Sequence, residues 1–390
     1  MSRKRIGILT GGGDVPGLNA AIRSAVLCSE DHHIDVLGIR RGWQGLTHVQ
    51  IVDGADPEYL LPLDRVNTRT VARQGGTFLH STRTQPSRMA AARLPDRLRG
   101  RLGALEEASP GVFDFTPVVL ENLETLGLDA LIAIGGDDTL SYARRLHLEG
   151  FPVVCIPKTM DNDVPNTEYC VGFSTAITRA VAAIRRQRTT VGSHERIGIF
   201  RIFGRDAGFT ALYTAYAVGI RCCIPECVFD LDSLLRVLQN DKRENPSSYA
   251  LVVLSEGATW HGRKVQEYGE PDAYGHRKKM SVGEALSHEV KVRLGEGTMV
   301  SDLTYDLRGG PPDFIDRIVA KTFASMAIEC IADSGSGRMM ALQRGCYVDA
   351  EIPGAEGKSR SVDVDSMYDP ENFLPKFGRL VGAPIFLNRL

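Results

Sequence analysis

The chain has 390 residues, which is long for one domain and predicts two. Its 46 basic and 48 acidic side chains give a formal net charge of −2, which argues against general affinity for nucleic acid or for an anionic membrane. There is no signal-peptide pattern and no run of about eighteen apolar residues, so a cytoplasmic location is expected. The eight cysteines are sparse and lack zinc spacing, so reduced, mostly buried thiols are expected.

Short apolar runs alternate with helical patterns along most of the chain. Strands are expected over residues 4–10, 34–40, 130–136, 151–156, 196–202 and 249–258. Helices are expected after the first and third of these strands, between the last two, and over 314–332. This alternation predicts parallel sheets covered on both faces. The polar stretch 260–278 is expected to be a surface excursion, and the last thirty residues an irregular tail.

The first expected strand ends in a glycine turn. Gly11, Gly12 and Gly13 precede Asp14, and a helix begins near Pro16. In open α/β sheets ligands bind beyond the carboxyl ends of strands, where glycines let backbone N–H groups approach phosphate oxygens. The turn is not a dinucleotide fingerprint, because Pro16 occupies the third glycine position. A packing role for these glycines is the alternative.

Two further strand ends carry unusual polar residues. Residues 135–139 read GGDDT, whose adjacent acids could cap the next helix or hold Mg²⁺. Residues 157–163 read PKTMDND, where Asp161 and Asp163 would face one side of an extended segment, although an ordinary turn is the alternative. Glycines for phosphate, an acid for metal, a lysine and a carboxylate base are together the groups that phosphoryl transfer needs.

At this point the sequence resembles the 6-phosphofructokinases, a family with ATP-dependent and pyrophosphate-dependent members. The resemblance covers nearly the whole chain, through TGGGDVPGLNAAIR, RQGGTFLHSTR, IGGDDT, PKTMDND, SHERIGIFRIFGRDAG, IPE and LRGG in the family's order. It implies two Rossmann-like three-layer α/β/α domains with mainly parallel sheets and the active site between them. Residues 1–172 plus 307–357 would bind the phosphoryl donor, and 173–306 plus 358–390 the sugar phosphate.

The resemblance also implies roles for individual residues. Asp161 would be the general base that takes the proton of the sugar 1-hydroxyl, and the other implied catalytic residues are Asp163, Thr159, Arg205 and Lys158. The implied donor-binding residues are Gly12, Arg83, Asp138 and Lys158, with Asp137 holding Mg²⁺. The implied sugar-phosphate-binding residues are Thr159, Arg196, Phe203, Gly204, Arg205, Glu226, Tyr305 and Arg308. Arg196 would reach a neighbouring subunit, so a homodimer or homotetramer is expected.

Two positions bear on the donor. Asp138 stands where the family's ATP-dependent bacterial enzymes have glycine, and its carboxylate would exclude an α-phosphate by volume and by like charge. Lys158 replaces a glycine of the same pattern and supplies a compact charge suited to pyrophosphate. Since some ATP-dependent members keep the lysine, Asp138 is the stronger discriminator. The pair is the pattern of the pyrophosphate-dependent branch, in which weak or absent allostery is expected.

Several residues depart from the family's pattern around the acceptor. Phe203 replaces a methionine, Arg201 a common glutamate, and Tyr305 a histidine of many ATP-dependent enzymes. Met299 stands where an arginine usually binds the sugar 6-phosphate, and losing such a charge-assisted hydrogen bond removes about 1.5–3 kcal/mol. Either another basic residue compensates, or the acceptor differs from fructose 6-phosphate, for which sedoheptulose 7-phosphate is a candidate.

The predicted function is therefore reversible, Mg²⁺-dependent phosphoryl transfer from pyrophosphate to fructose 6-phosphate in glycolysis. An ATP-dependent 6-phosphofructokinase is the first alternative. A catalytically silent sensor of sugar phosphates or nucleotides on the same fold is the second, against which the retained base, Asp161, argues. A Rossmann dehydrogenase is disfavoured by Pro16 and by the lack of an evident ribose-binding acid after the second strand.

Overall fold

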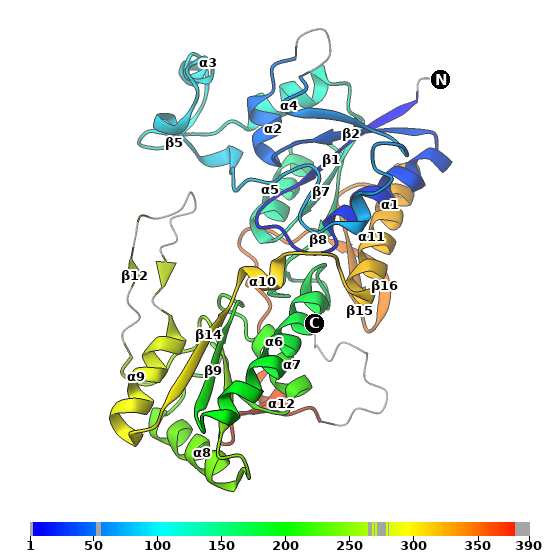
Figure 1. Cartoon of the computed structure of the whole chain (residues 1–390). Helices are drawn as coiled ribbons and strands as arrows, with labels where there is room; N and C mark the ends of the chain where they lie inside the picture. The colour runs from blue at the N-terminus through cyan, green and yellow to red at the C-terminus, as the bar shows by residue number, and fades with distance from the viewer. Residues whose placement is uncertain are drawn as a thin grey trace. The chain divides into compact units, whose positions relative to one another are not determined.

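The computed structural model describes residues 3–51, 56–263, 267–268, 270, 278–279 and 281–378, and its elements group into two compact units (Figure 1). The first unit comprises Met1–Thr159, Val164–Val171 and Gly310–Lys358, and the second comprises Met160–Asp163, Gly172–Gly309 and Ser359–Leu390. From the sequence, the chain is expected to cross between the units near residues 172, 307 and 358. The structure differs in one respect that bears on the site, because Met160–Asp163 belongs to the second unit.

A seven-stranded sheet forms the centre of the first unit. In spatial order its strands are β16 (Cys346–Glu351), β15 (Arg338–Gln343), β8 (Val153–Pro157), β7 (Ala130–Gly135), β1 (Lys4–Thr10), β2 (Ile34–Ile39) and β3 (Leu60–Leu63). Only the edge strands β16 and β3 run antiparallel to their neighbours. Strands β1, β7 and β8 end side by side, since Thr10 pairs with Ile134 and Gly135 with Pro157. The three strand ends singled out in the sequence therefore meet at one edge.

Helices cover both faces of this sheet, as its continuous apolar strands require. Helices α1 (Leu18–Asp31) and α11 (Phe314–Ala332) pack against each other on one face (Figure 1). On the other face, α2 (Trp43–His48), α4 (Thr116–Thr125) and α5 (Asp137–Leu148) enclose a core that contains Trp43, Leu123 and Leu140. This arrangement confirms the predicted α/β class.

A small excursion follows β3 in the first unit. Its elements are η1 (Val71–Arg73), η2 (Pro86–Arg88), β4 (Met89–Ala90), η3 (Ala91–Arg93), α3 (Asp96–Arg99), η4 (Leu102–Ala104), β5 (Glu107–Ser109) and β6 (Val112–Phe113). The strands form a three-stranded sheet in the order β4-β6-β5. Met89, Leu94, Leu98 and Phe115 give this excursion a separate apolar cluster.

The second unit is built on a four-stranded sheet. Its strands are β10 (Arg221–Cys223), β11 (Ala250–Ser255), β9 (Ile197–Ile202) and β14 (Thr298–Leu303), all parallel. The core between the sheet and helices α8 (Leu231–Glu244) and α9 (Val282–Leu294) contains Leu234, Leu238 and Leu286. Helices α6 (Phe173–Ser193) and α7 (Phe209–Val218) pack together, and the short helix α10 (Tyr305–Arg308) follows β14.

The C-terminal segment is more regular than the predicted irregular tail. It forms α12 (Val364–Met367) and an antiparallel pair of short strands, β17 (Tyr368–Asp369) and β18 (Leu374–Pro375). The Tyr368 hydroxyl donates to the Cys222 carbonyl at 2.8 Å, and Phe373 is buried in the core of the second unit. These two aromatic side chains supply the apolar area that orders the segment. Residues 379–390 lie outside the described part.

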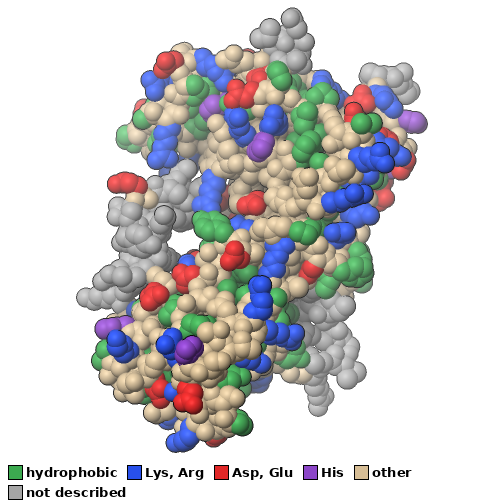
Figure 2. Space-filling view, in the orientation of Figure 1, with side chains coloured by type: hydrophobic (Ala, Val, Ile, Leu, Met, Phe, Trp, Pro, Cys, Tyr) green, Lys and Arg blue, Asp and Glu red, His purple; other side chains and the backbone are tan. Residues whose placement is uncertain are grey.

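The remaining predictions concern the surface and the cysteines. Of the polar excursion, β12 (Glu267–Tyr268) and β13 (Lys278–Lys279) form an antiparallel pair, and most of the other residues up to 278 lie outside the described ranges. Within the described ranges, every helix is too short or too polar to traverse a bilayer. Acidic and basic side chains are interspersed over the visible face (Figure 2). All eight cysteines are free thiols, of which four are buried and Cys346 is exposed.

Candidate active site

The glycine turn after β1 lies against the lysine of PKTMDND. Gly12 has a positive φ of 78°, and a Cβ added there would stand 3.1 Å from the Lys158 Nζ, so the ammonium group lies over the turn. The Lys158 backbone N–H donates to the Gly135 carbonyl at 2.9 Å. The Lys158 side chain is only 4% exposed. A buried cation over a glycine turn is suited to a compact polyanion.

The segment that carries Arg83 is fixed to the same turn. The Gly12 N–H donates to the Thr82 carbonyl at 3.0 Å, and the Ser81 hydroxyl donates to the Gly12 carbonyl at 2.5 Å. Arg83 itself is exposed. The structure thus brings Gly12, Arg83 and Lys158 to one edge of the first sheet, as the sequence analysis expects of donor-binding residues.

Two acids open helix α5 at this edge. Asp137 and Asp138 are its first two residues, where the helix dipole favours negative charge, and both are half-buried. A Cβ on the preceding Gly136 would stand 3.5 Å from the Lys158 carbonyl oxygen. The start of helix α5, which carries both acids, therefore lies next to the backbone of Lys158. Carboxylate oxygens are the ligands that Mg²⁺ prefers, usually together with substrate phosphates. The described residues include no cluster of three or more acidic, histidine or cysteine ligands, so the carboxylate of Asp137 fits this ion only as one ligand beside substrate phosphates.

The segment after β8 is not extended, which corrects the expectation for the two aspartates. Residues Met160 and Asp161 form a bend, and Asn162 has a left-handed backbone with φ 56°. The alternation that would place Asp161 and Asp163 on one side of a strand does not apply to such a turn. Both carboxylates are nevertheless buried, at 6% and 8% exposure. The Asp163 carbonyl accepts a hydrogen bond from the Arg360 N–H at 2.7 Å.

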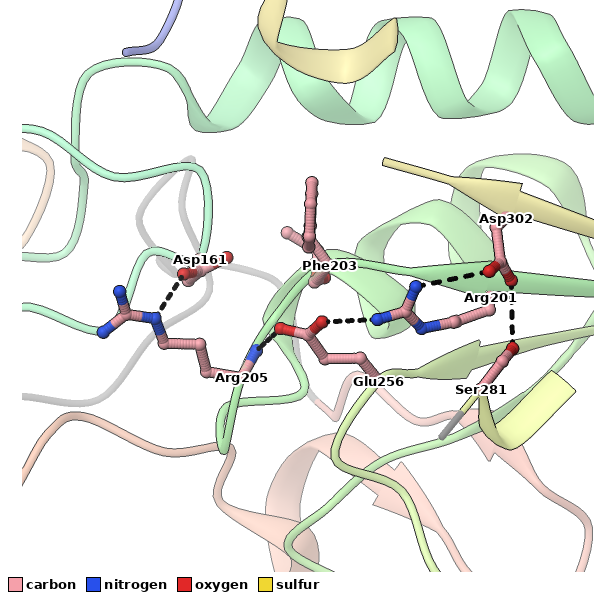
Figure 3. A network of polar contacts seen from close by, with 8 residues as sticks. Asp161, Arg201, Phe203, Arg205, Glu256, Ser281 and Asp302 are labelled. Carbon is pink, nitrogen blue, oxygen red and sulfur yellow. Dashed lines mark hydrogen bonds and ion pairs between the residues drawn. The ribbon is translucent and has the colours of Figure 1, made fainter. Parts of the chain in front are cut away.

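Asp161 lies near the arginine of the FGR motif. Its Oδ2 is 3.9 Å from the Arg205 Nε, and both residues belong to the second unit (Figure 3). Arg205 has a φ of 47°, so a second non-glycine residue with a left-handed backbone stands at the site. Strained residues of this kind cluster at functional sites. Thr159 is half-buried and is the last residue of the first unit before this segment.

Three of the predicted sugar-phosphate-binding residues pack on one another. The rings of Phe203 and Tyr305 meet edge to face at 6.0 Å, and the Arg308 guanidinium lies 4.9 Å from the Phe203 ring centre. Tyr305 is 78% exposed. Phe203, which replaces the family's methionine, therefore supports the side chains of α10. Gly204 adjoins it, and a Cβ there would stand 2.6 Å from the Ala207 carbonyl, so the turn requires glycine.

Two other predicted sugar-binding residues lie apart from this group. Arg196 is exposed and precedes β9, whereas Arg205 follows the opposite end of that strand. A strand of this length separates them by about 20 Å. Glu226 lies beyond β10, where its Oε1 accepts the N–H groups of Gly208 and Val362 at 2.8 and 2.7 Å. The roles of Arg196 and Glu226 stay predictions.

The environment of Glu226 yields a pH-dependent prediction. Burial raises the pKa of its carboxyl, partly opposed by the N–H groups of Val362 and Gly208. A folded-state pKa above the unfolded value means that stability is lost as pH rises through that window. Glu226→Gln should therefore unfold at a higher temperature than the parent at pH 7.5, with the difference vanishing near pH 3. Thermal unfolding followed by circular dichroism at both pH values measures this.

Asp369 provides a control of opposite sign. The Asn372 side chain lowers the pKa of the Asp369 carboxyl, so its stabilising contribution is present at neutral pH and lost in acid. Asp369→Asn should therefore be less stable than the parent at pH 7.5. A destabilised Glu226→Gln at pH 7.5 would contradict the prediction. Glu226→Gln also tests the predicted contact between Glu226 and the sugar. An unchanged KM for the sugar phosphate in this variant would argue against that contact.

A further carboxylate lies at this site, Glu256, which is outside the motifs singled out in the sequence. It follows β11, its Oε1 accepts the Arg205 N–H at 3.0 Å, and its Oε2 accepts from Arg201 Nη2 at 2.8 Å (Figure 3). Burial and then the Asp161 charge raise the pKa of Glu256, and Arg201 opposes them. The available signal was an acid at the end of an apolar strand and next to a glycine, since Asp137 stands in the same kind of position after Gly136.

Each α/β unit has a mainly parallel sheet, and the strand ends carry glycines, a buried lysine and carboxylates. This combination defines an enzyme that transfers a phosphoryl group. Residues 5–331 match the sequence model described as phosphofructokinase. The chain belongs to the phosphofructokinase family, which confirms the resemblance.

Curated relatives of similar identity carry two kinds of name. A pyrophosphate--fructose 6-phosphate 1-phosphotransferase of Dictyoglomus thermophilum is 35% identical over 367 residues, which cover 93% of this chain and 96% of that protein. One of Streptomyces coelicolor is 37% identical with the same coverage. The ATP-dependent 6-phosphofructokinase 3 of Streptomyces coelicolor is also 37% identical, covering 87% of this chain and 91% of that protein. Overall similarity therefore does not separate the donors.

Solved structures share the fold. The pyrophosphate-dependent phosphofructokinase of Nitrosospira multiformis superposes with a TM-score of 0.75 at 17% identity, over 96% of this chain and 89% of that one. The corresponding protein of Marinobacter aquaeolei gives 0.74 at 18% identity, over 96% and 88%. A phosphofructokinase of Saccharomyces cerevisiae gives 0.70 at 22% identity over 90% of this chain, which spans 45% of the yeast chain. These likenesses confirm the predicted fold.

Proposed function

We propose that the chain transfers a phosphoryl group from pyrophosphate to the 1-hydroxyl of fructose 6-phosphate, reversibly and with Mg²⁺, giving fructose 1,6-bisphosphate and phosphate in glycolysis. The observation that carries the proposal is the Lys158 ammonium over Gly12, next to the acids that open α5. The relatives of Dictyoglomus thermophilum and Streptomyces coelicolor that are named for this reaction support it. In this proposal the first unit binds the donor and the second the sugar phosphate.

The choice of pyrophosphate rests on the charges at the end of the first sheet. Lys158, Arg83 and the N–H groups of the glycine turn neutralise the donor's phosphates. Asp138 would face the position of an α-phosphate and repel it, because both groups are anionic. Asp137 would hold Mg²⁺, which would neutralise charge on the donor's oxygens when bound. Pyrophosphate has no nucleoside to accommodate, so the carboxylate of Asp138 excludes ATP without excluding this donor.

The acceptor chemistry is assigned to the second unit. Asp161 would take the proton of the sugar 1-hydroxyl as its oxygen forms a bond to phosphorus, and the bond between phosphorus and the departing phosphate breaks. Asp163 would support this base, Thr159 would hold the moving phosphoryl group, and Arg205 would steady its charge. Phe203, Gly204, Tyr305 and Arg308 would form the sugar-phosphate contacts, to which Glu226 would add hydrogen bonds. One P–O bond forms as another breaks and phosphorus keeps its oxidation state, so no oxidant or reductant is required.

A second candidate function is the same transfer from ATP. It is favoured by the relative named ATP-dependent 6-phosphofructokinase 3, which is as similar as the pyrophosphate-named relatives. A further candidate keeps pyrophosphate but uses another acceptor, such as sedoheptulose 7-phosphate, because Met299 replaces an expected arginine. Met299 is half-buried on β14, where its register partner is Gly198.

One assay separates these candidates. The purified protein is supplied with Mg²⁺, with either pyrophosphate or ATP, and with each of several sugar phosphates, and kcat/KM is measured for every pair. The proposal expects pyrophosphate with fructose 6-phosphate to be the best pair. A higher kcat/KM with ATP than with pyrophosphate would overturn the donor assignment. A higher kcat/KM with sedoheptulose 7-phosphate than with fructose 6-phosphate would overturn the acceptor assignment. No turnover with either donor would favour a sensor.

We also propose a cytoplasmic homodimer or homotetramer in which Arg196 serves the site of a neighbouring subunit. The exposure of Arg196 at the end of β9 remote from Arg205 supports this. Sedimentation velocity measures the oligomeric state. Mixing an Arg196→Ala variant with an Asp161→Asn variant should restore activity if the arginine acts across subunits, and no restored activity would contradict it.

A further inference from the structure

A row of alternating charges crosses the carboxyl edge of the second sheet. We call it the charge row, and it consists of Asp302, Arg201, Glu256, Arg205 and Asp161, with the neutral hydroxyl of Ser281 at the Asp302 end (Figure 3). The Ser281 hydroxyl donates to Asp302 Oδ1 at 3.2 Å, and Arg201 Nη1 donates to Asp302 Oδ2 at 3.4 Å. The contacts of Glu256 with Arg201 and Arg205, and of Arg205 with Asp161, complete it.

Strand register places Arg201 at the centre of this row. On β9 it pairs with Asp302 of β14 on one side and with Leu254 of β11 on the other, two residues before Glu256. Its side chain is 16% exposed, and that of Glu256 is 19% exposed. Ion pairs this shielded are screened far less by solvent than surface pairs. The pair between Arg201 and Glu256 is therefore largely shielded from solvent and salt.

Glu256 in turn holds the turn that carries Arg205. The Arg205 N–H points at Glu256 Oε1 while its own backbone is left-handed. On the other side of the turn, a Cβ on Gly257 would stand 2.2 Å from the Arg205 carbonyl, so the turn is packed directly on the residue after Glu256. A strained residue persists only where its surroundings over-determine it. The carboxylate of Glu256 is one such determinant.

We propose that Arg201 is a positioning residue for phosphoryl transfer: by pairing with Glu256 and Asp302, it fixes Glu256 beneath the Arg205 turn and so sets Arg205 against Asp161. This inference rests on the proposed function, which assigns catalysis to Arg205 and Asp161. Arg201 acts through Glu256 and is not expected to touch substrate, because two carboxylates already engage its guanidinium. It is thus not the cation that replaces the arginine absent at Met299.

The charges around Glu256 agree with this role. Burial and the Asp161 charge raise its pKa, whereas the Arg201 charge, the Arg205 N–H and the Arg205 charge lower it. Loss of Arg201 would raise the pKa of Glu256 further. A larger fraction of Glu256 would then be protonated at mildly acid pH, where the neutral acid holds the Arg205 N–H less strongly. The acid side of the pH profile consequently reports on Arg201.

The test compares Arg201→Met, Arg201→Lys and Asp302→Asn with the parent. We expect Arg201→Met to lower kcat about 10- to 100-fold, since small misplacements of catalytic groups have effects of that size. The KM for pyrophosphate should stay within about twofold, the acid limb of the kcat profile should move to higher pH, and Arg201→Lys should restore most of kcat. Asp302→Asn, which removes only the outer partner, should show a smaller change in the same direction.

Arg221→Met is the matched control. Arg221 is 19% exposed and is paired with Asp241 through two nitrogens, at 2.7 and 2.5 Å, at the amino end of β10. It should lose thermal stability as Arg201→Met does, but keep the parent's kcat and pH profile. If Arg201→Met resembles Arg221→Met in every measurement, Arg201 is merely structural and the inference is overturned.

Hydrogen exchange of the peptide over residues 203–208 provides a readout independent of activity. Arg201→Met should exchange faster than the parent over this peptide, and Arg221→Met should not. Unchanged exchange in Arg201→Met overturns the inference even if kcat falls. If the parent protein transfers no phosphoryl group to any acceptor, the proposed function fails, whereas the exchange experiment still decides whether Arg201 holds the Arg205 turn.

Discussion

Asp161→Asn is expected to lower kcat by about 10²- to 10⁴-fold, the usual contribution of a general base, while leaving the KM for the sugar phosphate within a few-fold. Asparagine keeps the shape of the side chain but cannot accept the proton of the 1-hydroxyl. The carboxylate is 6% exposed and its Oδ2 lies 3.9 Å from the Arg205 Nε, so it is buried beside the arginine that is assigned to steady the transferred group. Steady-state kinetics in the presence of Mg²⁺ measures the change.

Asp163→Asn is the control for Asp161→Asn. Asp163 lies two residues after Asp161 in the same turn and is 8% exposed, so both substitutions impose a similar structural change. Its assigned role is support of the base, and a smaller loss of kcat is expected. Thermal unfolding of both variants shows whether the fold is retained. If Asp161→Asn keeps kcat within tenfold of the parent while folded, the general base is another residue.

The second large effect concerns the donor. Asp138→Gly should raise kcat/KM with ATP about a hundredfold, because a like charge at about 5 Å and an effective dielectric of about 20 costs roughly 3 kcal/mol. Lys158→Gly should weaken the reaction with pyrophosphate, because the ammonium over Gly12 is lost. The ratio of kcat/KM with pyrophosphate to that with ATP should therefore fall in each variant.

Asp138→Asn separates the two causes of ATP exclusion. Asparagine removes the charge of Asp138 and keeps its volume. If kcat/KM with ATP rises in both Asp138→Asn and Asp138→Gly, ATP is excluded by charge repulsion. If it rises only in Asp138→Gly, ATP is excluded by the volume of the side chain. Lys158→Met likewise removes the charge of Lys158 while methionine fills the buried space over Gly12, so it separates the loss of charge from the loss of volume. An unchanged donor ratio in Asp138→Gly would remove the physical basis for assigning pyrophosphate.

Elements with chemically marked ends were predictable from the sequence. Strand β1 spans Lys4–Thr10 as predicted because glycines end it, and helix α11 spans Phe314–Ala332 because Asp313 caps it, with its side chain accepting the Asp316 N–H at 2.9 Å. Parallel strands end at a common edge of the sheet, so the meeting of the glycine turn, the α5 acids and Lys158 also followed from the pattern.

Features that depend on non-local packing were not predictable. Asn162 adopts a left-handed backbone in a segment whose sequence also suits an extended strand, and only its surroundings decide between the two. Arg201 and Asp302 meet across 101 positions of sequence, so neither residue alone indicates the other. The sequence marks Glu256 as an acid at a strand end, but its partners depend on the register of three strands.

The distribution of the cysteines makes the protein suited to single-site labelling. Cys346, at the start of β16, is exposed, whereas the other seven are buried or half-buried. Burial also raises the pKa of most of those thiols, including Cys155, Cys222 and Cys330, and so suppresses the reactive thiolate. A maleimide dye should therefore attach first at the β15–β16 hairpin, which labels the protein at one defined position without any engineered cysteine.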